Sequence, residues 1–380
     1  MKISYLLGSI GRTGGNVVIF HHIQALYEAQ NEVYVVSPFG KEKWDENALD
    51  KYLNTSNTGY TGIWRWLKKV QYFLKKNFGF LEKNIKNFYL KRPKKYANWI
   101  TNKLIENWEP ADITIATHSL TVNAANVLAK KTNVYYHMQG FEPWFVEDEE
   151  YKKISLDSYH FPIKKIANSS WLKEKVFSIS NDPDISLVFP GLNHSIFYNK
   201  HDLLNKYNNP KIIKITSYAD SRPLKGWKES IEAMEYVFDY FKNKEVKIEW
   251  SVFGSITNWN TDLPINYKGF LSHTQLSELY NQSHIVFIPS WFESFPLQPI
   301  EAMACGTTIL TTKIGTEDYS RHLETAFVIE PKNIELLREG LIKLIENPNL
   351  MLDLSKAGLI EAQKYNWENS KNQLFDALGL

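Results

Sequence analysis

The strongest constraint on this chain is a repeated alternation between short apolar runs and longer segments of helical apolar spacing. The first forty residues contain strand-like runs at 2–7 and 32–37, with a helical pattern at 16–29 between them. Further strand-like runs follow at 113–117 and 134–137. Strands that alternate with helices are typical of a parallel sheet covered on both faces, so we expect an α/β fold.

The same alternation restarts near residue 200. The later segments are strand-like runs at 212–218, 247–253, 285–289 and 308–312 and helical patterns at 228–241, 274–281, 299–304 and 334–346. Residues 189–197 carry the proline and glycine expected of a hinge. A chain of 380 residues is long for one hydrophobic core. We therefore expect two Rossmann-like domains, at residues 1–195 and 196–365.

The composition narrows the cellular setting. The net charge of +2 does not by itself demand a polyanionic partner, and the single cysteine excludes an internal disulfide framework. The apolar run at the N-terminus is too short for a signal peptide, and no run of about 18 apolar residues could span a membrane. A cytoplasmic protein is expected.

Residues 63–103 interrupt the alternation with many Lys and Arg residues, against the single acid Glu82, and with interleaved aromatic residues. A basic amphipathic helix of this kind can bind an anionic membrane surface, here the inner face of the cell membrane. The equally weighted alternative is a solvated basic face over a packed aromatic face. Nucleic-acid binding is not expected, because no nucleic-acid motif accompanies the charge.

The segment Glu293-Ser-Phe-Pro-Leu-Gln-Pro-Ile-Glu301 holds two acids and two prolines. Proline is favoured at a helix start, so we expect a helix from Pro299 with Glu301 in its first turn and Glu293 in the loop before it. The site would lie at the carboxyl end of a parallel strand, where ligands bind. Free amides at a helix start suit a diphosphate, and carboxylates can bind sugar hydroxyls. Taken alone, two surface acids would explain the segment.

The stretch from Glu293 through Ile300-Glu-Ala-Met-Ala-Cys-Gly306 resembles the signature of retaining glycosyltransferase family 4. Thr13-Gly14-Gly15 and the run 188–197 are similar to further segments of that family, as is Tyr365-Asn-Trp367. The resemblance implies the GT-B fold, with two facing Rossmann-like domains around a cleft. It also implies that a C-terminal helix, residues 366–380, packs back on the first domain.

The resemblance assigns roles to the residues of this signature. Glu301 would bind the ribose of the donor nucleotide, and Glu293 would face the donor sugar. Backbone amides of Phe295 and Leu297 would contact the diphosphate, with Pro296 standing where the family often has glycine. Gly14 and Gly15 would approach the donor phosphates from the other domain.

A basic loop, Arg222-Pro-Leu-Lys225-Gly226, follows the first strand of the second domain. A fixed Arg and Lys stabilise the charge that a diphosphate gains as it leaves. The alternative is a solvated basic loop. The family carries an Arg and a Lys-Gly here at a longer spacing, and we assign Arg222 and Lys225 to the diphosphate.

Two strands of the first domain end in polar residues. His118 follows one strand and could donate a hydrogen bond to the donor sugar, or be a structural histidine. Gln139 and Glu142 follow the next and resemble a segment of the subgroup that includes rhamnosyltransferases. They would contact the donor sugar or the acceptor.

No metal or other cofactor is expected, because no His, Cys or Asp cluster has metal-ligand spacing. Asp182-Pro-Asp184 imitates a metal motif but lies among turn residues, so we expect a solvated turn. Cys305 follows the signature among small and apolar residues, and a buried thiol is expected.

The expected function is retaining transfer of a sugar from a nucleotide-diphosphate sugar to a glycan or lipid-linked acceptor. Such a reaction would serve the synthesis of cell-surface polysaccharides or glycoconjugates. One alternative is a nucleotide-sugar epimerase on the same fold. Another is a non-catalytic scaffold subunit that supports a partner transferase.

Overall fold

The computed structural model describes residues 1–8, 14–54, 92–256 and 261–380. The larger part of the basic segment 63–103 lies outside the described residues. The chain divides into two compact units. Unit 1 comprises residues 1–168, 172–188 and 374–380, and unit 2 comprises residues 169–171 and 189–373.

Unit 1 is built on a seven-stranded sheet in the order β3-β2-β1-β4-β5-β6-β7. Six strands run parallel, and only β3 pairs antiparallel to its neighbour β2. The strands are β1 (Lys2–Leu6), β2 (Glu32–Ser37), β3 (Gly40–Lys43), β4 (Ile113–Ala116), β5 (Asn133–Met138), β6 (Lys164–Ala167) and β7 (Ile185–Leu187). The strand order reverses between β1 and β4. Sheets of this kind bind ligands at such a switch point, in the loops that follow the carboxyl ends of the strands.

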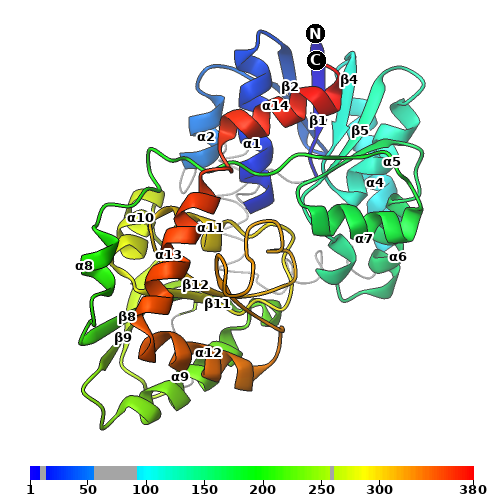
Figure 1. Ribbon diagram of the computed structural model, residues 1–380. Helices are drawn as coiled ribbons and strands as arrows, with labels where there is room; N and C mark the ends of the chain where they lie inside the picture. The colour runs from blue at the N-terminus through cyan, green and yellow to red at the C-terminus, as the bar shows by residue number, and fades with distance from the viewer. Residues whose placement is uncertain (9–13, 55–91, 257–260) are drawn as a thin grey trace, which may run out of the picture. The chain divides into compact units, whose positions relative to one another are not determined.

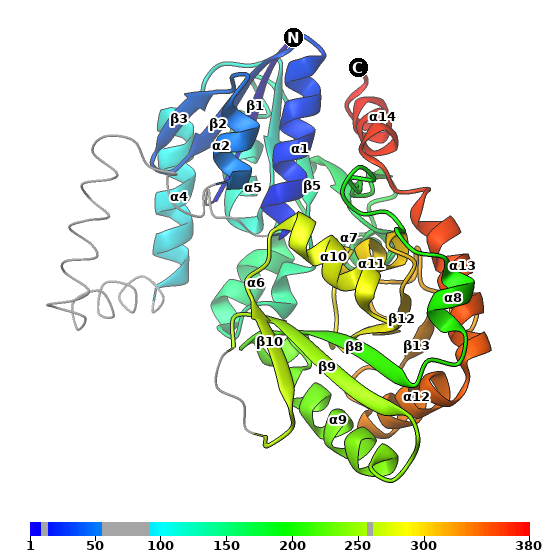
Figure 2. The same cartoon turned by 90° about the vertical axis from the view of Figure 1, so that its left-hand side faces the viewer.

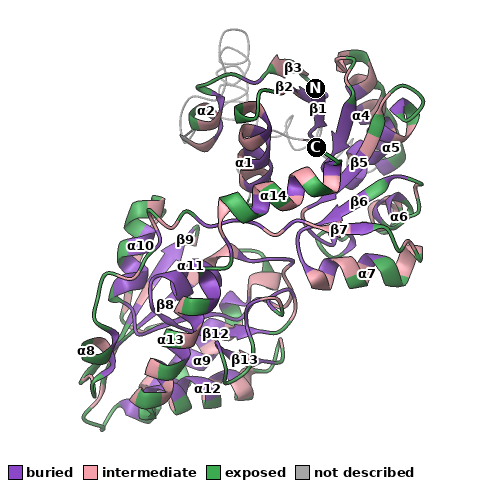
Figure 3. Ribbon diagram, turned by 45° about the horizontal axis from the view of Figure 1, so that its top comes forward, coloured by how far each residue is buried: buried purple, intermediate pink, exposed green. Residues whose placement is uncertain are grey.

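The helices of unit 1 cover its sheet. One apolar cluster joins β1, β2 and β4 to α1 (Gly14–Glu28), α2 (Ala48–Asn54) and the end of α14 (Trp367–Leu378). The remaining helices are α4 (Pro93–Asn107), α5 (Ser119–Leu128), α6 (Glu149–Ser158) and α7 (Ser170–Ser180), with the short 3₁₀ helix η1 (Glu142–Trp144). Figure 2 shows α4 beside β2 and β3. Figure 3 shows that the inner strands of the sheet are largely buried, whereas β3 at its edge is not, and that the helices expose their outer faces.

Unit 2 has a six-stranded parallel sheet in the order β10-β9-β8-β11-β12-β13. Its strands are β8 (Ile212–Ala219), β9 (Lys247–Gly254), β10 (Ile265–Gly269), β11 (Ile285–Ile288), β12 (Thr308–Thr312) and β13 (Phe327–Ile329). Its helices are α8 (Leu203–Tyr207), η2 (Pro223–Lys225), α9 (Trp227–Phe241), α10 (His273–Gln282), α11 (Leu297–Ala304), α12 (Ile334–Glu346) and α13 (Pro348–Ala362). The switch point lies between β8 and β11 (Figure 1).

Alternating side chains on the strands of unit 2 reach two separate cores. Ile285 and Phe287 of β11 join a cluster with α9, α12 and α13, whereas Val286 and Ile288 join one with α10 and α11. A strand presents successive side chains to opposite faces, so both faces of this sheet are apolar and covered. The prediction of an α/β chain with two sheets of parallel strands is confirmed.

Candidate functional site

The switch point of unit 2 brings together three of the residues singled out in the sequence. The loop after β8 carries Arg222 and Lys225, and the loop after the adjacent strand β11 carries Glu293. The two loops are joined by a hydrogen bond from the amide of Trp291 to the carbonyl of Leu224, at 2.8 Å. Lys225 and Glu293, which are 68 positions apart in sequence, thus share one edge of the sheet because their strands are neighbours.

Lys225 and Glu293 form a direct ion pair. The Lys225 Nζ lies 2.5 Å from Glu293 Oε1, and each side chain is only 12% exposed. The amide of Glu293 donates to the carbonyl of Ile314, which fixes the backbone beneath the carboxylate. A shielded ion pair of this kind holds its two charges in fixed positions next to the helix start that follows.

Two glycines permit the close approach of these loops. Gly226 ends η2 with a φ of 68°, and a Cβ there would lie 2.1 Å from the carbonyl oxygen of Pro289. Gly315 has a φ of 85°, and a Cβ there would lie 2.2 Å from the carbonyl oxygen of Glu293. No other residue type fits these positions without moving the site backbone.

Arg222 is oriented by Asp220, which was not singled out in the sequence. The Nε and Nη2 atoms of Arg222 donate to the two carboxylate oxygens of Asp220, each at 2.8 Å. Burial alone would raise the pKa of Asp220, but the hydrogen bonds from Arg222 and Tyr218 hold it well below its usual value. The available signal was an acid two residues before the arginine in a loop that ends a strand.

The structure corrects the expected start of the signature helix. The helix α11 begins at Leu297 with Pro296 as its N-cap, two residues before Pro299. Pro299 is tolerated as the third helical residue because the first amides of a helix have no partner within it. Glu301 therefore lies beyond the first turn, and the prediction that it lies in the first turn of a helix from Pro299 is wrong.

Free amides nevertheless surround the start of α11. Among the described residues, none accepts a hydrogen bond from the amides of Phe295, Leu297 or Gln298. The loop that carries them is held in place, because Tyr319 donates its hydroxyl to the Pro296 carbonyl at 2.7 Å and its ring packs against Phe295. Aligned amides at a helix N-terminus are an anion site, and the adjacent Lys225 adds a positive charge.

Glu301 is a buried carboxylate rather than a surface acid. The residue is only 7% exposed, and no described residue donates a hydrogen bond to its carboxyl group. Burial raises the pKa of Glu301 to about 8. A buried acid without a protein partner is free to bind hydroxyl groups of a ligand.

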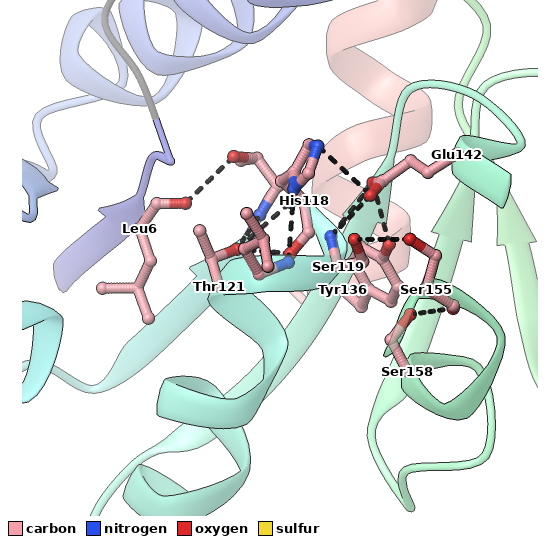
Figure 4. A network of polar contacts seen from close by, with 10 residues as sticks. Leu6, His118, Ser119, Thr121, Tyr136, Glu142, Ser155 and Ser158 are labelled. Carbon is pink, nitrogen blue, oxygen red and sulfur yellow. Dashed lines mark hydrogen bonds and ion pairs between the residues drawn. The ribbon is translucent and has the colours of Figure 1, made fainter. Parts of the chain in front are cut away.

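In unit 1, His118 and Glu142 form one polar network at the switch point between β1 and β4 (Figure 4). Glu142 is buried, and its carboxylate accepts hydrogen bonds from the Ser119 amide at 2.9 and 3.0 Å and from the Tyr136 hydroxyl at 3.0 Å. The Nε2 of His118 lies 3.2 Å from the second carboxylate oxygen. The network ties η1 to the start of α5 and to β5.

The ring of His118 also caps α5. Its Nδ1 accepts a hydrogen bond from the Leu120 amide at 3.2 Å, so a neutral ring carries its proton on Nε2 and donates it to Glu142. Both nitrogens of His118 are therefore engaged by the protein, and the carboxylate of Glu142 is fully occupied. In this arrangement the two residues brace the loop after β5.

Gln139 lies against the start of α1, which Gly14 and Gly15 form. A Cβ on Gly15 would lie 3.0 Å from the Cβ of Gln139, so a larger residue at position 15 would press on this side chain. The carboxamide nitrogen and oxygen of Gln139 are buried and bond to no described residue. A buried unpaired amide costs about 1–3 kcal/mol, so this position favours a polar ligand.

Two further sequence expectations meet a clear outcome. Asp182 is not merely solvated: its carboxylate pairs at 2.6 Å with Lys165, whose side chain is 1% exposed, because a buried ammonium needs a charged partner. The expectation of a solvated turn is therefore wrong for Asp182, whose ion pair holds the turn against β6. Cys305 is buried as expected, and burial raises the pKa of its thiol to about 11.

The described residues hold neither a metal-binding cluster nor a membrane-spanning helix. Across 1–8, 14–54, 92–256 and 261–380, no group of three or more His, Cys, Asp or Glu side chains is placed to hold a metal ion. Within the same ranges, no helix is long and apolar enough to span a membrane.

Comparison with known proteins identifies the domain in unit 2. Residues 199–360 match the family described as Glycosyl transferases group 1. The D-inositol 3-phosphate glycosyltransferase of Rhodococcus erythropolis is 29% identical over 104 residues, which are 27% of this chain and 24% of that protein. An uncharacterized glycosyltransferase of Methanocaldococcus jannaschii is 24% identical over 227 residues, 54% of this chain and 56% of that protein. The matches thus span less than two thirds of these relatives' own length.

A solved structure resembles the chain over its whole length. Anabaena HepE, crystallised with UDP and glucose, has a TM-score of 0.70 at 13% identity, covering 100% of this chain and 99% of that chain. The chain therefore has the GT-B fold, and residues 199–360 of its second unit are similar to the glycosyl transferases group 1 family.

Proposed function

We propose that the protein is a retaining glycosyltransferase, of family 4 and its rhamnosyltransferase-like subgroup, that moves a sugar from a nucleotide-diphosphate donor to a glycan or lipid-linked acceptor. The observation that carries the proposal is the Lys225–Glu293 pair beside the free amides at the start of α11. The group 1 match over residues 199–360 supports it, as does the binding of UDP and glucose by a protein of the same fold.

Different residues of the site would bind different parts of the donor. The amides of Phe295, Leu297 and Gln298 would receive the diphosphate, with Lys225 and Arg222 neutralising the charge that grows on it as the sugar leaves. Glu293 would accept hydrogen bonds from hydroxyls of the sugar. Glu301, buried and without a protein partner, would bind the ribose.

The reaction would proceed without a protein nucleophile. The carbon–oxygen bond to the diphosphate breaks, and the acceptor hydroxyl attacks the same face of the sugar. The departing phosphate takes the proton of that hydroxyl, so the configuration at the sugar carbon is retained. Neither a metal nor another cofactor takes part in this proposal, because Lys225, Arg222 and the helix amides supply the positive potential.

The test compares nucleotide binding and turnover in Glu293→Gln and in a matched control. Glu339→Gln removes an exposed carboxylate from α12, away from the switch point. We expect a nucleotide sugar to be hydrolysed or transferred by the wild type and the control, and at least 100-fold more slowly by Glu293→Gln. Equal activity in all three proteins would refute the proposal. Inversion at the sugar carbon, detected by NMR of the product, would refute the retaining mechanism alone.

A further inference from the structure

We infer that Trp144 and Lys175 of unit 1 form a saccharide subsite, in which the indole ring stacks on a sugar of the acceptor. The inference rests on the proposed function, because only a transferase needs an acceptor. Its starting point is a pair of adjacent aromatic residues left open to solvent: Trp144 is 38% exposed and Phe145 is 43% exposed. They lie on the loop that follows β5, at the carboxyl end of the sheet.

The position of Trp144 is fixed by the polar network beneath it. Trp144 closes the short helix η1, whose first residue is the buried and fully hydrogen-bonded Glu142. Its amide donates to the carbonyl of Phe141 at 3.1 Å, and the next amide donates to the carbonyl of Glu142 at 2.9 Å. A side chain presented by a braced turn loses little freedom when a ligand binds.

The indole ring itself is also held. It meets the ring of Phe141 edge-on, with the centroids 5.2 Å apart and the planes at 81°. Phe141 is buried and stacks on Tyr159, so the contact connects Trp144 to the core of the unit. The exposed part of the ring is therefore a rigid apolar surface rather than a loose side chain.

Lys175 supplies the polar component next to this surface. Its Nζ lies 5.4 Å from the ring centroids of both Trp144 and Phe141. Among the described residues it makes no ion pair, and two acids on the neighbouring α6 are engaged elsewhere: Asp148 caps that helix and Glu149 pairs with Lys152. Its ammonium can therefore donate hydrogen bonds to a ligand that covers the ring.

A saccharide fits this combination better than other ligands. A sugar ring has an apolar face of C–H groups, which stacks on an aromatic ring, and an edge of oxygen atoms, which accept hydrogen bonds from an ammonium. Most small-molecule sites likewise pair apolar surface with a few placed polar groups. A uronate or a sugar phosphate would add a charge for Lys175, whereas a neutral sugar would use hydrogen bonds alone.

The test measures sugar binding to the full chain by saturation-transfer NMR, with methyl α-D-glucopyranoside, methyl α-D-mannopyranoside and methyl β-D-glucuronide as probes. Trp144→Ala should weaken binding of the preferred probe about tenfold, which is the loss of one stacking contact, and Trp144→Phe should retain most of it. Phe177→Ala is the matched control, because Phe177 is an aromatic residue of α7 that is 48% exposed. A stronger effect of Lys175→Ala on the glucuronide than on the neutral probes would identify an anionic acceptor.

Two results would overturn the inference. In the first, Trp144→Ala binds every probe as the wild type does, or no probe binds at all. In the second, Phe177→Ala loses as much probe binding as Trp144→Ala. Binding of UDP, GDP, dTDP and ADP to the same samples separates this failure from failure of the proposed function. A wild type that binds a nucleotide but shows no Trp144-dependent sugar binding contradicts only the saccharide subsite.

Discussion

At the scale of single residues, Glu301 shows how burial alone prepares a side chain for a ligand. The carboxyl group has no protein partner, and its burial raises its pKa to about 8 from an ordinary value of 4.5. The folded protein therefore binds the proton of Glu301 more tightly than the unfolded chain does. Its contribution to stability is complete below pH 4.5 and is lost as the pH rises towards 8.

Replacing Glu301 with Gln should remove this pH dependence. Glutamine has the shape of the protonated acid and cannot ionise, so it keeps the favourable state at every pH. Between pH 5.5 and pH 8.5 we expect the wild type to lose about 3 kcal/mol of unfolding free energy relative to Glu301→Gln. Urea denaturation of both proteins at the two pH values measures the difference. Parallel stability profiles would mean that Glu301 is not a buried acid.

Asp220 acts through its neighbour and gives a second prediction. Asp220→Asn removes the charge that holds the guanidinium of Arg222, so we expect the dissociation constant for a nucleoside diphosphate to rise about tenfold. The double variant Asp220→Asn, Arg222→Ala should bind no more weakly than Arg222→Ala alone, because Asp220 acts only by orienting Arg222. Calorimetric titration measures all four proteins. Additive losses would show that Asp220 has a separate role.

At the scale of elements, the site depends on loops that meet where two strands end. Gly226 lets the loop after β8 touch the loop after β11, since a Cβ would lie 2.1 Å from the Pro289 carbonyl oxygen. Gly269, at the end of β10, has nearly the same backbone angle, with a φ of 70°, but nothing lies within 4 Å of an added Cβ. Alanine at Gly269 would meet only the strain of a left-handed backbone, whereas alanine at Gly226 would meet that strain and a steric clash as well.

We expect Gly269→Ala to cost about 1 kcal/mol of unfolding free energy, from backbone strain alone. Gly226→Ala should cost more than twice as much, because the backbone of the loop after β8 must also move. It should weaken nucleotide binding as well, whereas Gly269→Ala should not. Denaturation midpoints and calorimetry of the two variants make the comparison. Equal losses of unfolding free energy and of nucleotide affinity in both variants would show that the contact with Pro289 does not matter for the site.

The elements also show what the sequence could predict. The alternation of apolar periods predicted the central strands of both sheets, because buried parallel strands are nearly continuous apolar runs. It did not predict the short or outer strands β3, β6, β7, β10 and β13. The start of α11 was misplaced, because Pro299 can occupy the third helical position as well as the first. The ion pair of Asp182 with Lys165 was missed because it depends on the meeting of β6 with the turn before β7. Asp220 was missed because an acid two residues before an arginine is not a distinctive pattern by itself.

For the first unit, the sequence predicted contacts of His118, Gln139 and Glu142 with a donor sugar or an acceptor, and these roles stay predictions. The three residues follow β4 and β5, at the carboxyl ends of these strands. The sequence could not show that Ser119, Tyr136 and His118 all bind the carboxylate of Glu142, because these contacts form only when η1 lies beside the start of α5. The exposed ring of Trp144 was likewise hidden in an aromatic-rich sequence.

At the scale of the whole molecule, two α/β units divide the chemistry between them. Unit 2 offers free helix amides and a shielded Lys–Glu pair, which suit a nucleotide-diphosphate sugar. Unit 1 offers a braced loop with the unpaired amide of Gln139 and an exposed aromatic ring. The segment that matches the glycosyl transferases group 1 family, residues 199–360, lies wholly in unit 2, where the sequence motifs of the proposed donor site are also found.

The most direct test of the central claim is calorimetric titration of the wild type and Lys225→Ala with UDP, GDP, dTDP and ADP. We expect one of these nucleotides to bind the wild type in the micromolar range and Lys225→Ala at least tenfold more weakly, since the variant lacks the cation beside the α11 amides. Absence of binding by all four nucleotides, or equal binding by both proteins, would contradict a donor site at Lys225, Glu293 and the start of α11.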